Sequence, residues 1–578
     1  MAGNKQPACR PGETRERTIV SGRIKAGIAG IVGAVVAFGV TELVHGLYES
    51  VPSVFVALAQ GVVEFTPGEL VTRGIELLGQ ADIPVLVASM IVGTLVFAAL
   101  LANLALRRPV LALVGVAVLA AVGIAASLAQ PFVAIVPTIV TVVGGLILGV
   151  AVTETLLRAS GLRAAKPAGS EAAPPPGDSS PVVRSREAYS EGGISVNRRN
   201  FLVLGGGAAA AGRTALGVGR LLAGRGVQAS SAPKPLKLPE SPAKPTDQQS
   251  SGQEGKGGGQ SAMKHETLPP PPEDASIDVP GMPKLITPAA NFYLIDTELI
   301  SPRIDVNTWK LSVKGAVGHP IEFSYKDLLG MSTREADITL SCVSNEVGGG
   351  LVSNGRWTGV LLSDVLAEAG VSRDKITRAS QQLVGRSVDG FTAGFKTQIA
   401  LDGREALVAF GLNGSELPLK HGYPVRLVVP GLYGYVSATK WLSEIELTNW
   451  NFDAYWIQRT WSKEGPIKTQ SRIDTVEDDA QISAGKTPIG GIAWAPHRGI
   501  ERVEVSTDGG ATWNEAHLAK QLALDTWRQY VYEWDAKPGQ YTLQVRATDG
   551  TGETQTAAEA PPHPSGASGY HTIEVTVA

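Results

Sequence analysis

The residue with the clearest potential for chemistry is Cys342, at the end of the stretch ITLSCVSNEVGG. Alternating apolar and polar residues before it predict a strand that ends near the turn Gly348-Gly349-Gly350, which would put the thiol at a strand-to-loop junction. The other cysteine in the sequence is Cys9, and the arrangement argued below puts a membrane between the two. An unpaired thiol outside the cytoplasm is exposed to oxidation, so its presence favours chemistry or metal ligation. The alternative, a small buried hydrophobic residue, stays open at this point.

Two further motifs follow TLSCVSNEVGG in order, GRWTGVLLSDVL and HGYPVRLVVPGLYGYVSATKWL. Together the three motifs resemble the sulfite oxidase family of molybdopterin enzymes, and the resemblance runs from about Pro288 to the C-terminus. In that family the cysteine thiolate is a direct ligand of molybdenum. The resemblance therefore implies a molybdopterin-dependent oxidoreductase with a Mo-molybdopterin cofactor and Cys342 as the metal ligand, in keeping with the preference of a soft thiolate for such metals.

The residues that would hold the pterin and its phosphate come from the third motif. A phosphate requires fixed cations and hydrogen-bond donors, and the resemblance assigns this role to His421, Arg426 and Lys440. Ser437 and Thr439 could add hydroxyl hydrogen bonds. Each residue taken singly has a simpler interpretation, such as a surface ion pair for Arg426 or a solvated strand end for Lys440.

The expected substrate pocket departs from that of sulfite-oxidising members. The positions that match the family's two anion-binding arginines hold Ile295 and Val347, and the position of its active-site tyrosine holds Phe410. Trp357 in GRWTG matches the family pattern, and Arg498 in APHRG is a candidate for the arginine contributed by the C-terminal domain. We therefore count Trp357, Phe410 and Arg498 with Cys342 as catalytic-site candidates.

These departures weaken the case for a dianionic substrate, because fixed cations hold such anions. Asp296 and Glu346 lie near the lost positions and would repel an anion further. The resulting hypothesis is oxygen-atom transfer on a small, non-anionic substrate of the sulfoxide or N-oxide type. Because the sequence shows no haem or iron–sulfur motif in this half, electrons would pass through a separate cytochrome or quinone-linked carrier. The alternatives are a sulfite-oxidising enzyme with a rebuilt anion pocket and a non-catalytic surface binding protein.

The second half of the chain is expected to form two domains. Short strands mixed with short helices over 288–462 predict an α+β molybdopterin domain. Regularly spaced strands over 463–578, with a hairpin turn at Asp508-Gly509, predict an all-β immunoglobulin-like sandwich. In the family that this half resembles, the second domain mediates dimerisation, so a homodimer is expected.

The first half of the chain predicts an all-α transmembrane bundle. After a cytoplasmic tail at 1–23, the region 24–157 contains about four apolar runs of roughly 20 residues, which is the length needed to cross a bilayer. The runs are 24–48, 84–106, 110–129 and 132–157, with breaks at Arg107-Arg108-Pro109 and Gln130-Pro131. Segment 51–63 is apolar but short, and is expected to be interfacial or re-entrant. Lysines and arginines before the first run and after the second and fourth place these ends in the cytoplasm.

Three connecting segments lead to the soluble half. Residues 158–200 are expected to form a cytoplasmic linker, and 201–224 a fifth apolar segment preceded by Arg198-Arg199, which has the pattern of a twin-arginine export signal. A basic flank on an ordinary helix is the alternative. Residues 225–287 are expected to be a Pro/Gly-rich disordered spacer. These predictions together give a multi-pass plasma-membrane protein with an extracytoplasmic catalytic domain.

Composition excludes several classes of protein. At 578 residues the chain must contain several domains, and its net charge of −3 gives no electrostatic basis for binding nucleic acid. The sequence contains no HExxH or CxxC metal motif. Trp441, Trp456 and Trp461 are expected to be core or interface residues rather than a base-stacking surface.

Overall fold

The computed structural model describes residues 11–48, 50–66, 70, 82–130, 133–163, 198–231, 234–238, 265–297 and 301–578. These residues divide into two compact units, one made of the helices up to residue 229 and one that contains the C-terminal half from residue 230. Cys9 and Pro131 lie outside the described residues, as do residues 164–197 of the expected linker and most of the expected spacer.

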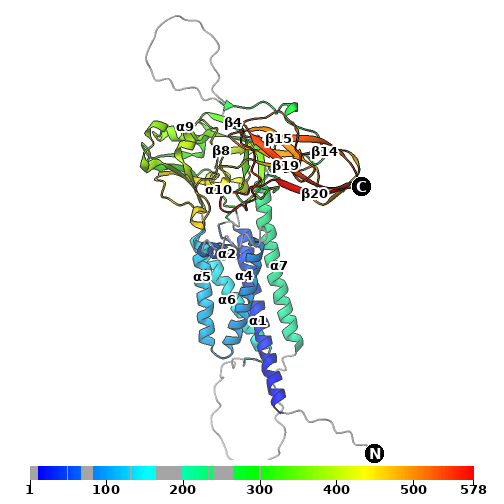
Figure 1. Cartoon of the computed structure of the whole chain (residues 1–578). Helices are drawn as coiled ribbons and strands as arrows, with labels where there is room; N and C mark the ends of the chain where they lie inside the picture. The colour runs from blue at the N-terminus through cyan, green and yellow to red at the C-terminus, as the bar shows by residue number, and fades with distance from the viewer. Residues whose placement is uncertain are drawn as a thin grey trace, which may run out of the picture. The chain divides into compact units, whose positions relative to one another are not determined.

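The secondary structure of the first unit, in the residues that the structure describes, is helical (Figure 1). Its helices are α1 (Pro11–Leu47), α2 (Val54–Phe65), α4 (Asp82–Ala105), α5 (Pro109–Leu128), α6 (Ile135–Ala159) and α7 (Arg198–Ser231). In the described residues, four of these contain segments long and apolar enough to cross a membrane: Gly22–Leu47, Val85–Ala105, Pro109–Leu128 and Ile135–Ala159. Helix α2, with 12 residues, is about 18 Å long and too short to span.

Glycines let α1 approach its neighbours closely. A Cβ added to Gly33 would lie 2.5 Å from the carbonyl oxygen of Gly149 on α6, and one added to Gly30 would lie 2.4 Å from that of Ala98 on α4. Small residues at such contacts allow close packing of helix backbones inside a membrane. Helix α1 is therefore the central helix, in contact with both α4 and α6.

Helix α7 packs on another part of α1 through glycines spaced by seven residues. Added Cβ atoms at Gly39 and Gly46 would each lie 2.3 Å from carbonyl oxygens of α7, those of Gly212 and Gly219. Phe201, near the start of α7, is buried with Ala26 of α1 and Leu156 of α6. The expected fifth apolar segment, 201–224, thus lies within α7, which packs on α1 through glycines.

The second unit begins with an α+β domain built on two sheets. The first sheet has the order β1-β4-β5-β8-β10, with β9 paired to β8, and the second has the order β3-β2-β11-β6-β7. The strands of the first are β1 (His265–Glu266), β4 (Thr333–Ser341), β5 (Val352–Leu361), β8 (Leu407–Leu412), β9 (Ser415–Glu416) and β10 (Arg426–Val428). Those of the second are β2 (Lys310–Gly315), β3 (Ile321–Ser324), β6 (Gln382–Ser387), β7 (Thr392–Lys396) and β11 (Leu442–Thr448). Three short helices complete the domain: α8 (Tyr325–Leu329), α9 (Leu362–Glu368) and α10 (Gly434–Ser437).

The C-terminal domain is a sandwich of two sheets, in the orders β12-β14-β18-β17 and β13-β20-β19-β15-β16. Its strands are β12 (Gln470–Ile473), β13 (Ala480–Ile482), β14 (Gly485–Trp494), β15 (Ile500–Ser506), β16 (Asn514–Glu515), β17 (His517–Leu518), β18 (Arg528–Ala536), β19 (Gly539–Asp549) and β20 (His571–Val577). Ile489, Val503 and Leu543 are fully buried between the sheets. The expected three-part fold class, a helical bundle, an α+β domain and an immunoglobulin-like sandwich, is confirmed.

The structure differs from the sequence-based expectation in two local respects. Strand β1 lies inside the expected spacer 225–287 and pairs with β4, while Leu285 and Ala275 of the same stretch are buried in the core of the α+β domain. Burial of these apolar side chains stabilises the folded form of the end of this otherwise polar segment. The alternation of apolar and polar residues over 291–315 is typical of strands, and its last part forms β2. The described residues of this run before β2 contain no strand, and Phe292, Tyr293 and Ile295 instead line the cavity described next.

Candidate active site

Cys342 follows the last residue of β4, as expected, and its backbone N–H donates to the carbonyl of Leu351 at 2.9 Å. Only 8% of the residue is exposed, and it is a free cysteine. Burial raises the pKa of the thiol, while N–H groups of Val343 and Ser344 and the Ser344 hydroxyl, which hydrogen-bond to the sulfur, work against that rise. Donors aimed at the sulfur are suited to a thiolate, the form that ligates a metal.

A cavity of about 110 Å³ opens beside Cys342. It is lined by segments far apart in the sequence: 292–297, 340–344, 387–391, 421–441 and the two tryptophans Trp456 and Trp461. Cys342, His421, Arg426 and Lys440 all lie on its wall. The structure thus brings one soft ligand and three nitrogen donors of the third sequence motif together around a single space.

Local backbone geometry explains how His421 and Arg426 come to lie together. Gly422 adopts a left-handed conformation with φ of 108°, and an added Cβ would lie 3.1 Å from Arg426 Cβ and Lys440 Cα. A residue with a side chain would be strained there and would push the two cations away. Arg426 then begins β10, where its guanidinium lies 5.1 Å from the ring centre of Trp357.

The partners of Arg426 are all neutral. Its guanidinium donates to the carbonyls of His421 at 3.1 Å and of Ala438 and Leu427 at 3.4 Å. Burial lowers its pKa to about 10, and in the described part of the chain no carboxylate forms an ion pair with it. A buried guanidinium held only by carbonyls is incompletely compensated, so it offers a fixed positive charge to an anion such as a phosphate.

His421 is uncharged in this environment. Burial, followed by the charges of Arg426 and Lys440, lowers its pKa to about 3. Its Nε2 lies 3.1 Å from the carbonyl oxygen of Ala289 and so donates to it, which leaves Nδ1 as an acceptor. A neutral imidazole can then accept a hydrogen bond from a bound group without adding charge to the cavity.

Lys440 is shared between the cavity and a carboxylate. Its ammonium pairs with Asp296 and donates to the carbonyl of Lys420 at 3.2 Å. Burial lowers the pKa of Lys440 to about 8 and raises that of Asp296, and each partner opposes the shift of the other. Asp389 lines the same cavity, and burial raises its pKa too. The cavity therefore holds three basic groups and two acidic ones.

Five other candidates from the sequence do not line this cavity. Trp357 is fully buried and donates to the carbonyl of Ile338 at 3.2 Å, and Phe410 packs in the core with its ring centre 6.4 Å from that of Tyr325. Ser437 and Thr439 donate to backbone carbonyls of Tyr433 and Gly385 at 3.0 and 3.4 Å. Arg498 pairs with Asp549 at 2.8 Å in the sandwich domain. Trp357 is linked to the site through Arg426, whose guanidinium lies over its ring.

Several lining residues were not proposed from the sequence. Tyr293, Ser344, Asp389 and Tyr435 belong to this group, and Trp441, Trp456 and Trp461, which were expected to be packing residues, also line the space. Ser344 could have been found by its place two residues after Cys342. Asp389 carried no comparable signal, because it lies in a turn whose position beside Lys440 depends on the pairing of β6 with β11.

Comparison with known proteins agrees with this architecture. Residues 298–456 match the oxidoreductase molybdopterin binding domain, and residues 463–560 match the Mo-co oxidoreductase dimerisation domain. Mitochondrial sulfite oxidase of Rattus norvegicus is 33% identical over 271 residues, which cover 40% of this chain and 49% of that protein. This part of the chain is similar to the sulfite oxidase family of molybdopterin oxidoreductases. The family implies a Mo-molybdopterin cofactor.

The chain is also similar to oxidoreductases other than sulfite oxidases. An NADH nitrate reductase of Brassica napus is 26% identical over 298 residues, covering 42% of this chain and 32% of that protein. The sulfane dehydrogenase SoxCD of Paracoccus pantotrophus aligns with a TM-score of 0.45 and 25% identity over 51% of this chain and 82% of that chain. The chain spans about half the length of the mammalian sulfite oxidases it matches.

Proposed function

We propose that the chain is a membrane-anchored molybdopterin oxidoreductase that transfers an oxygen atom to or from a small, non-anionic substrate of the sulfoxide or N-oxide type. Its electrons would be exchanged with a separate cytochrome or quinone-linked carrier. The observation that carries the substrate class is the pairing of Lys440 with Asp296 inside the cavity of Cys342. In that pair the negative charge of Asp296 offsets the positive charge of Lys440, so Lys440 adds no net charge to the cavity.

The residues around the cavity fit the cofactor. Cys342 would ligate the metal, and His421, Arg426 and Lys440 would hold the pterin and its phosphate; the incompletely compensated charge of Arg426 is the feature that best suits a phosphate. Bound there, the cofactor supplies two-electron oxygen-atom transfer. The chain's own residues bind and orient it, and the aromatic wall of Tyr435, Trp456 and Trp461 limits the access of water.

Ile295 strengthens the argument against an anion. It lines the cavity, whereas the matching position in sulfite-oxidising members of the family is an arginine. Each lost charge-assisted hydrogen bond is worth about 1.5–3 kcal/mol. The absence of both arginines, at the positions of Ile295 and Val347, would therefore weaken the binding of an oxyanion by roughly two to four orders of magnitude. Arg498 does not replace them, because its guanidinium is bonded to Asp549 and to the carbonyl of Ile467.

The remaining parts of the proposal concern location and assembly. The four long apolar helices support insertion in the plasma membrane, and the basic residues after the second and fourth support a cytoplasmic position for these ends. The second unit would then be extracytoplasmic through a further crossing by α7, the expected fifth apolar segment. The match to a dimerisation domain supports a homodimer through residues 463–560. Arg198 and Arg199 would act as a twin-arginine export signal, which suits a domain that receives its cofactor before transport.

Two measurements on the purified full-length protein test the proposal. Metal analysis after expression with cofactor supply should find about one molybdenum per chain, while none would support the alternative of a non-catalytic binding protein. Steady-state assays should then show turnover of dimethyl sulfoxide or trimethylamine N-oxide with a reduced electron donor, with two electrons and two protons consumed and the oxygen released as water. Sulfite oxidation should be negligible. Efficient sulfite turnover would instead identify a sulfite oxidase whose anion pocket uses other cations.

A further inference from the structure

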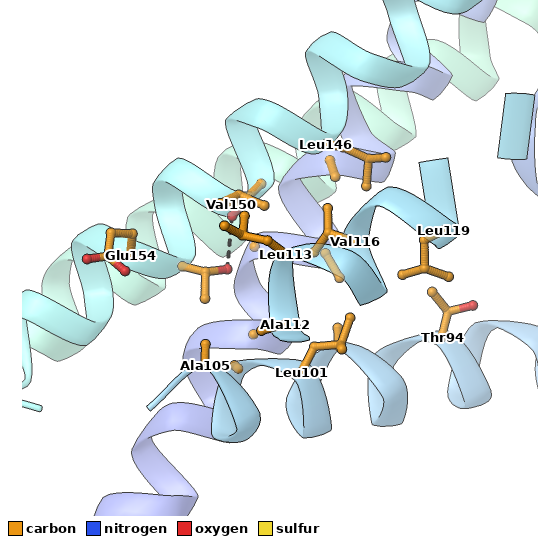
Figure 2. A pocket seen from close by; sticks show the side chains of 18 of the residues that line it. Thr94, Leu101, Ala105, Ala112, Leu113, Val116, Leu119, Leu146, Val150 and Glu154 are labelled. Atoms are coloured by element: carbon orange, nitrogen blue, oxygen red, sulfur yellow. Dashed lines mark hydrogen bonds between the residues drawn. The ribbon is translucent and has the colours of Figure 1, made fainter. Parts of the chain in front are cut away.

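A second cavity lies inside the helical unit, apart from the site of Cys342. It has a volume of about 260 Å³ and is bounded by α1, α2, α4, α5 and α6. Figure 2 shows its wall, where Leu101, Leu113, Val116 and Leu146 face one another and Glu154 marks one end. Apart from a few threonines and the charged end, the lining is aliphatic, so the space suits a hydrocarbon chain rather than water.

The end of the cavity at Glu154 is strongly basic. Arg163 lines the cavity there, pairs with Glu154 and donates to the carbonyl of Ala105 at 2.9 Å, while Arg158 pairs with Glu154 at 2.9 Å. A Cβ added to Gly22 would lie 3.4 Å from Leu162 Cδ2, so the start of the apolar part of α1 lies at the same level. The basic residues gathered at this end are Arg23, Lys25, Arg107, Arg108, Arg158 and Arg163.

These charges are not balanced by acidic residues. In the described ranges 22–30, 100–112 and 153–163, Glu154 is the one carboxylate, against six cations. Arg23, Arg107 and Arg108 are exposed. A surplus of positive charge at the end of a membrane helix bundle favours an anionic headgroup, and each arginine near the surface contributes to such binding.

We propose that this cavity holds an acyl chain of one anionic phospholipid, with the phosphate among the six basic residues, which we call the basic end. The apolar lining excludes a free phosphate as the main occupant, because it would leave the hydrocarbon-lined space unfilled. The surplus charge favours a phospholipid over a neutral isoprenoid quinone, whose head would gain nothing from the cations. Few of the described residues of α4 and α5 are buried by protein. The bound lipid would connect these helices to the rest of the bundle.

The binding experiment uses the full-length protein in detergent, stripped of lipid and studied by native mass spectrometry. We would add phosphatidylglycerol, phosphatidylcholine with the same acyl chains, or ubiquinone. We expect one phosphatidylglycerol retained per chain and at least tenfold weaker retention of the other two. Equal retention of the two phospholipids, or preferential retention of the quinone, would overturn the proposal.

Two pairs of variants place the lipid. Ala112→Phe and Val116→Phe fill the cavity from α5 and should abolish retention, whereas Val114→Phe, on the same helix and 54% exposed, should not. Arg23→Gln with Arg108→Gln leaves Lys25 and Arg107 to preserve the charge bias for insertion, and should lower affinity for phosphatidylglycerol by about tenfold or more. Arg213→Gln with Arg220→Gln, exposed on α7, is the matched control. Retention by both cavity-filling variants, in monodisperse protein of normal helicity, would contradict the site, and the molybdenum content is independent of either result.

Discussion

At the scale of single residues, the cavity of Cys342 combines cations suited to the cofactor with carboxylates that oppose an anionic substrate. Arg426 is buried among carbonyls, and Lys440 is paired with Asp296. These are different environments for two residues that the sequence offered as equivalent phosphate ligands. We therefore expect substitutions at the two positions to separate cofactor retention from substrate preference.

Replacing Cys342 by serine tests metal ligation. A hydroxyl is a poor ligand for a soft metal and nearly matches the thiol in size, so we expect activity to fall by at least a hundredfold while the fold is retained. Activity assays and thermal unfolding of the variant would be compared with those of Cys9→Ser, which should behave as wild type. Normal turnover by Cys342→Ser would remove the basis for its assigned role.

Replacing Asp296 by asparagine tests the charge argument. The change frees the ammonium of Lys440 in a buried cavity, so it should improve the ratio of kcat/KM for sulfite to that for a sulfoxide by about tenfold or more, as expected for one charge-assisted hydrogen bond. The pKa of Lys440 should also fall below about 8, because it loses its carboxylate partner. Glu322→Gln, an exposed partner of Lys310, provides a control whose ratio should not change. An unchanged ratio in Asp296→Asn would show that Lys440 does not meet the substrate.

The sequence predicts only those site residues that lie within recognisable motifs. Cys342, His421, Arg426 and Lys440 come from two motifs and share one cavity. Phe410 could not be placed in advance, because every residue of β8 is buried and no apolar–polar alternation shows which face meets the cavity. The position of Arg498 depends on Asp549, which lies 51 residues further along the chain, and no local pattern records that pairing.

At the scale of elements, the helical unit shows both what hydropathy predicts and what it misses. The expected runs 24–48, 84–106, 110–129 and 132–157 correspond to four long helices, because length and apolarity are enough to identify such helices. The packing of α7 on α1 was not predictable in the same way. It depends on the register between Gly39 and Gly212, two residues with no side chain to indicate a face.

Gly212→Leu tests the contact between α1 and α7. The added Cβ would lie 2.9 Å from the carbonyl oxygen of Val35, so the helices must separate, at a cost of roughly 1–3 kcal/mol. Cysteine crosslinking between the two helices should become inefficient. Gly217→Leu is the control, because nothing lies within 4 Å of an added Cβ there. Equal crosslinking in both variants would show that the two helices do not pack through Gly212.

Two titratable groups near the end of β12 have opposite effects on pH stability: His571, which begins β20, and Asp474, which follows β12. Burial lowers the pKa of His571 to about 4, and its Nδ1 accepts the N–H of Ile473 at 3.0 Å. As pH falls from 6.5 to 4 the unfolded state binds a proton that the folded imidazole does not, which destabilises the fold by up to about 3 kcal/mol. Burial raises the pKa of Asp474 to about 6, so over pH 6 to 4 the folded carboxyl binds a proton first and stability rises by a similar amount.

The two effects nearly cancel in the wild type, and single substitutions should reveal them. Asp474→Asn leaves the His571 effect, so its unfolding temperature should fall as the pH is lowered from 6.5 to 4. His571→Gln leaves the Asp474 effect, so its unfolding temperature should rise over pH 6 to 4 relative to the wild type. Thermal unfolding of the full chain at several pH values provides the measurement. Slopes of the same sign in the two variants would contradict the assignment.

At the scale of the whole molecule, the chain joins a helical unit with four long apolar helices to a unit whose domains are similar to those of molybdopterin oxidoreductases. The net charge of −3 conceals that division, whereas hydropathy along the chain reveals it. The order of the parts requires the second unit to reach its compartment with the cofactor already bound, if the export hypothesis holds. Arg198 and Arg199 begin α7, the helix at whose end the second unit starts.

Replacing Arg198 and Arg199 with lysine separates the two interpretations of this pair. Twin-arginine export recognises the guanidinium pair, whereas membrane orientation depends only on positive charge. If the pair is an export signal, the variant should keep the second unit in the cytoplasm, and labelling from outside the cell should fall at least tenfold. Lys234→Arg, downstream of α7, is a matched substitution that should leave labelling unchanged. Unchanged labelling of the double lysine variant would identify the pair as a basic flank.

Strand β4, which ends one residue before Cys342, is also hydrogen-bonded to the sandwich domain. The backbone N–H of Thr339 donates to the carbonyl of Asp525 at 2.9 Å, and its hydroxyl accepts the N–H of Trp527 at 2.8 Å. Because these bonds join the two domains, the amide proton of Thr339 can exchange with solvent deuterium only when the domains separate there. Its exchange rate therefore reports how often the two domains separate three residues from the thiol. Cofactor loading should lower this exchange rate if the loaded site holds the two domains together.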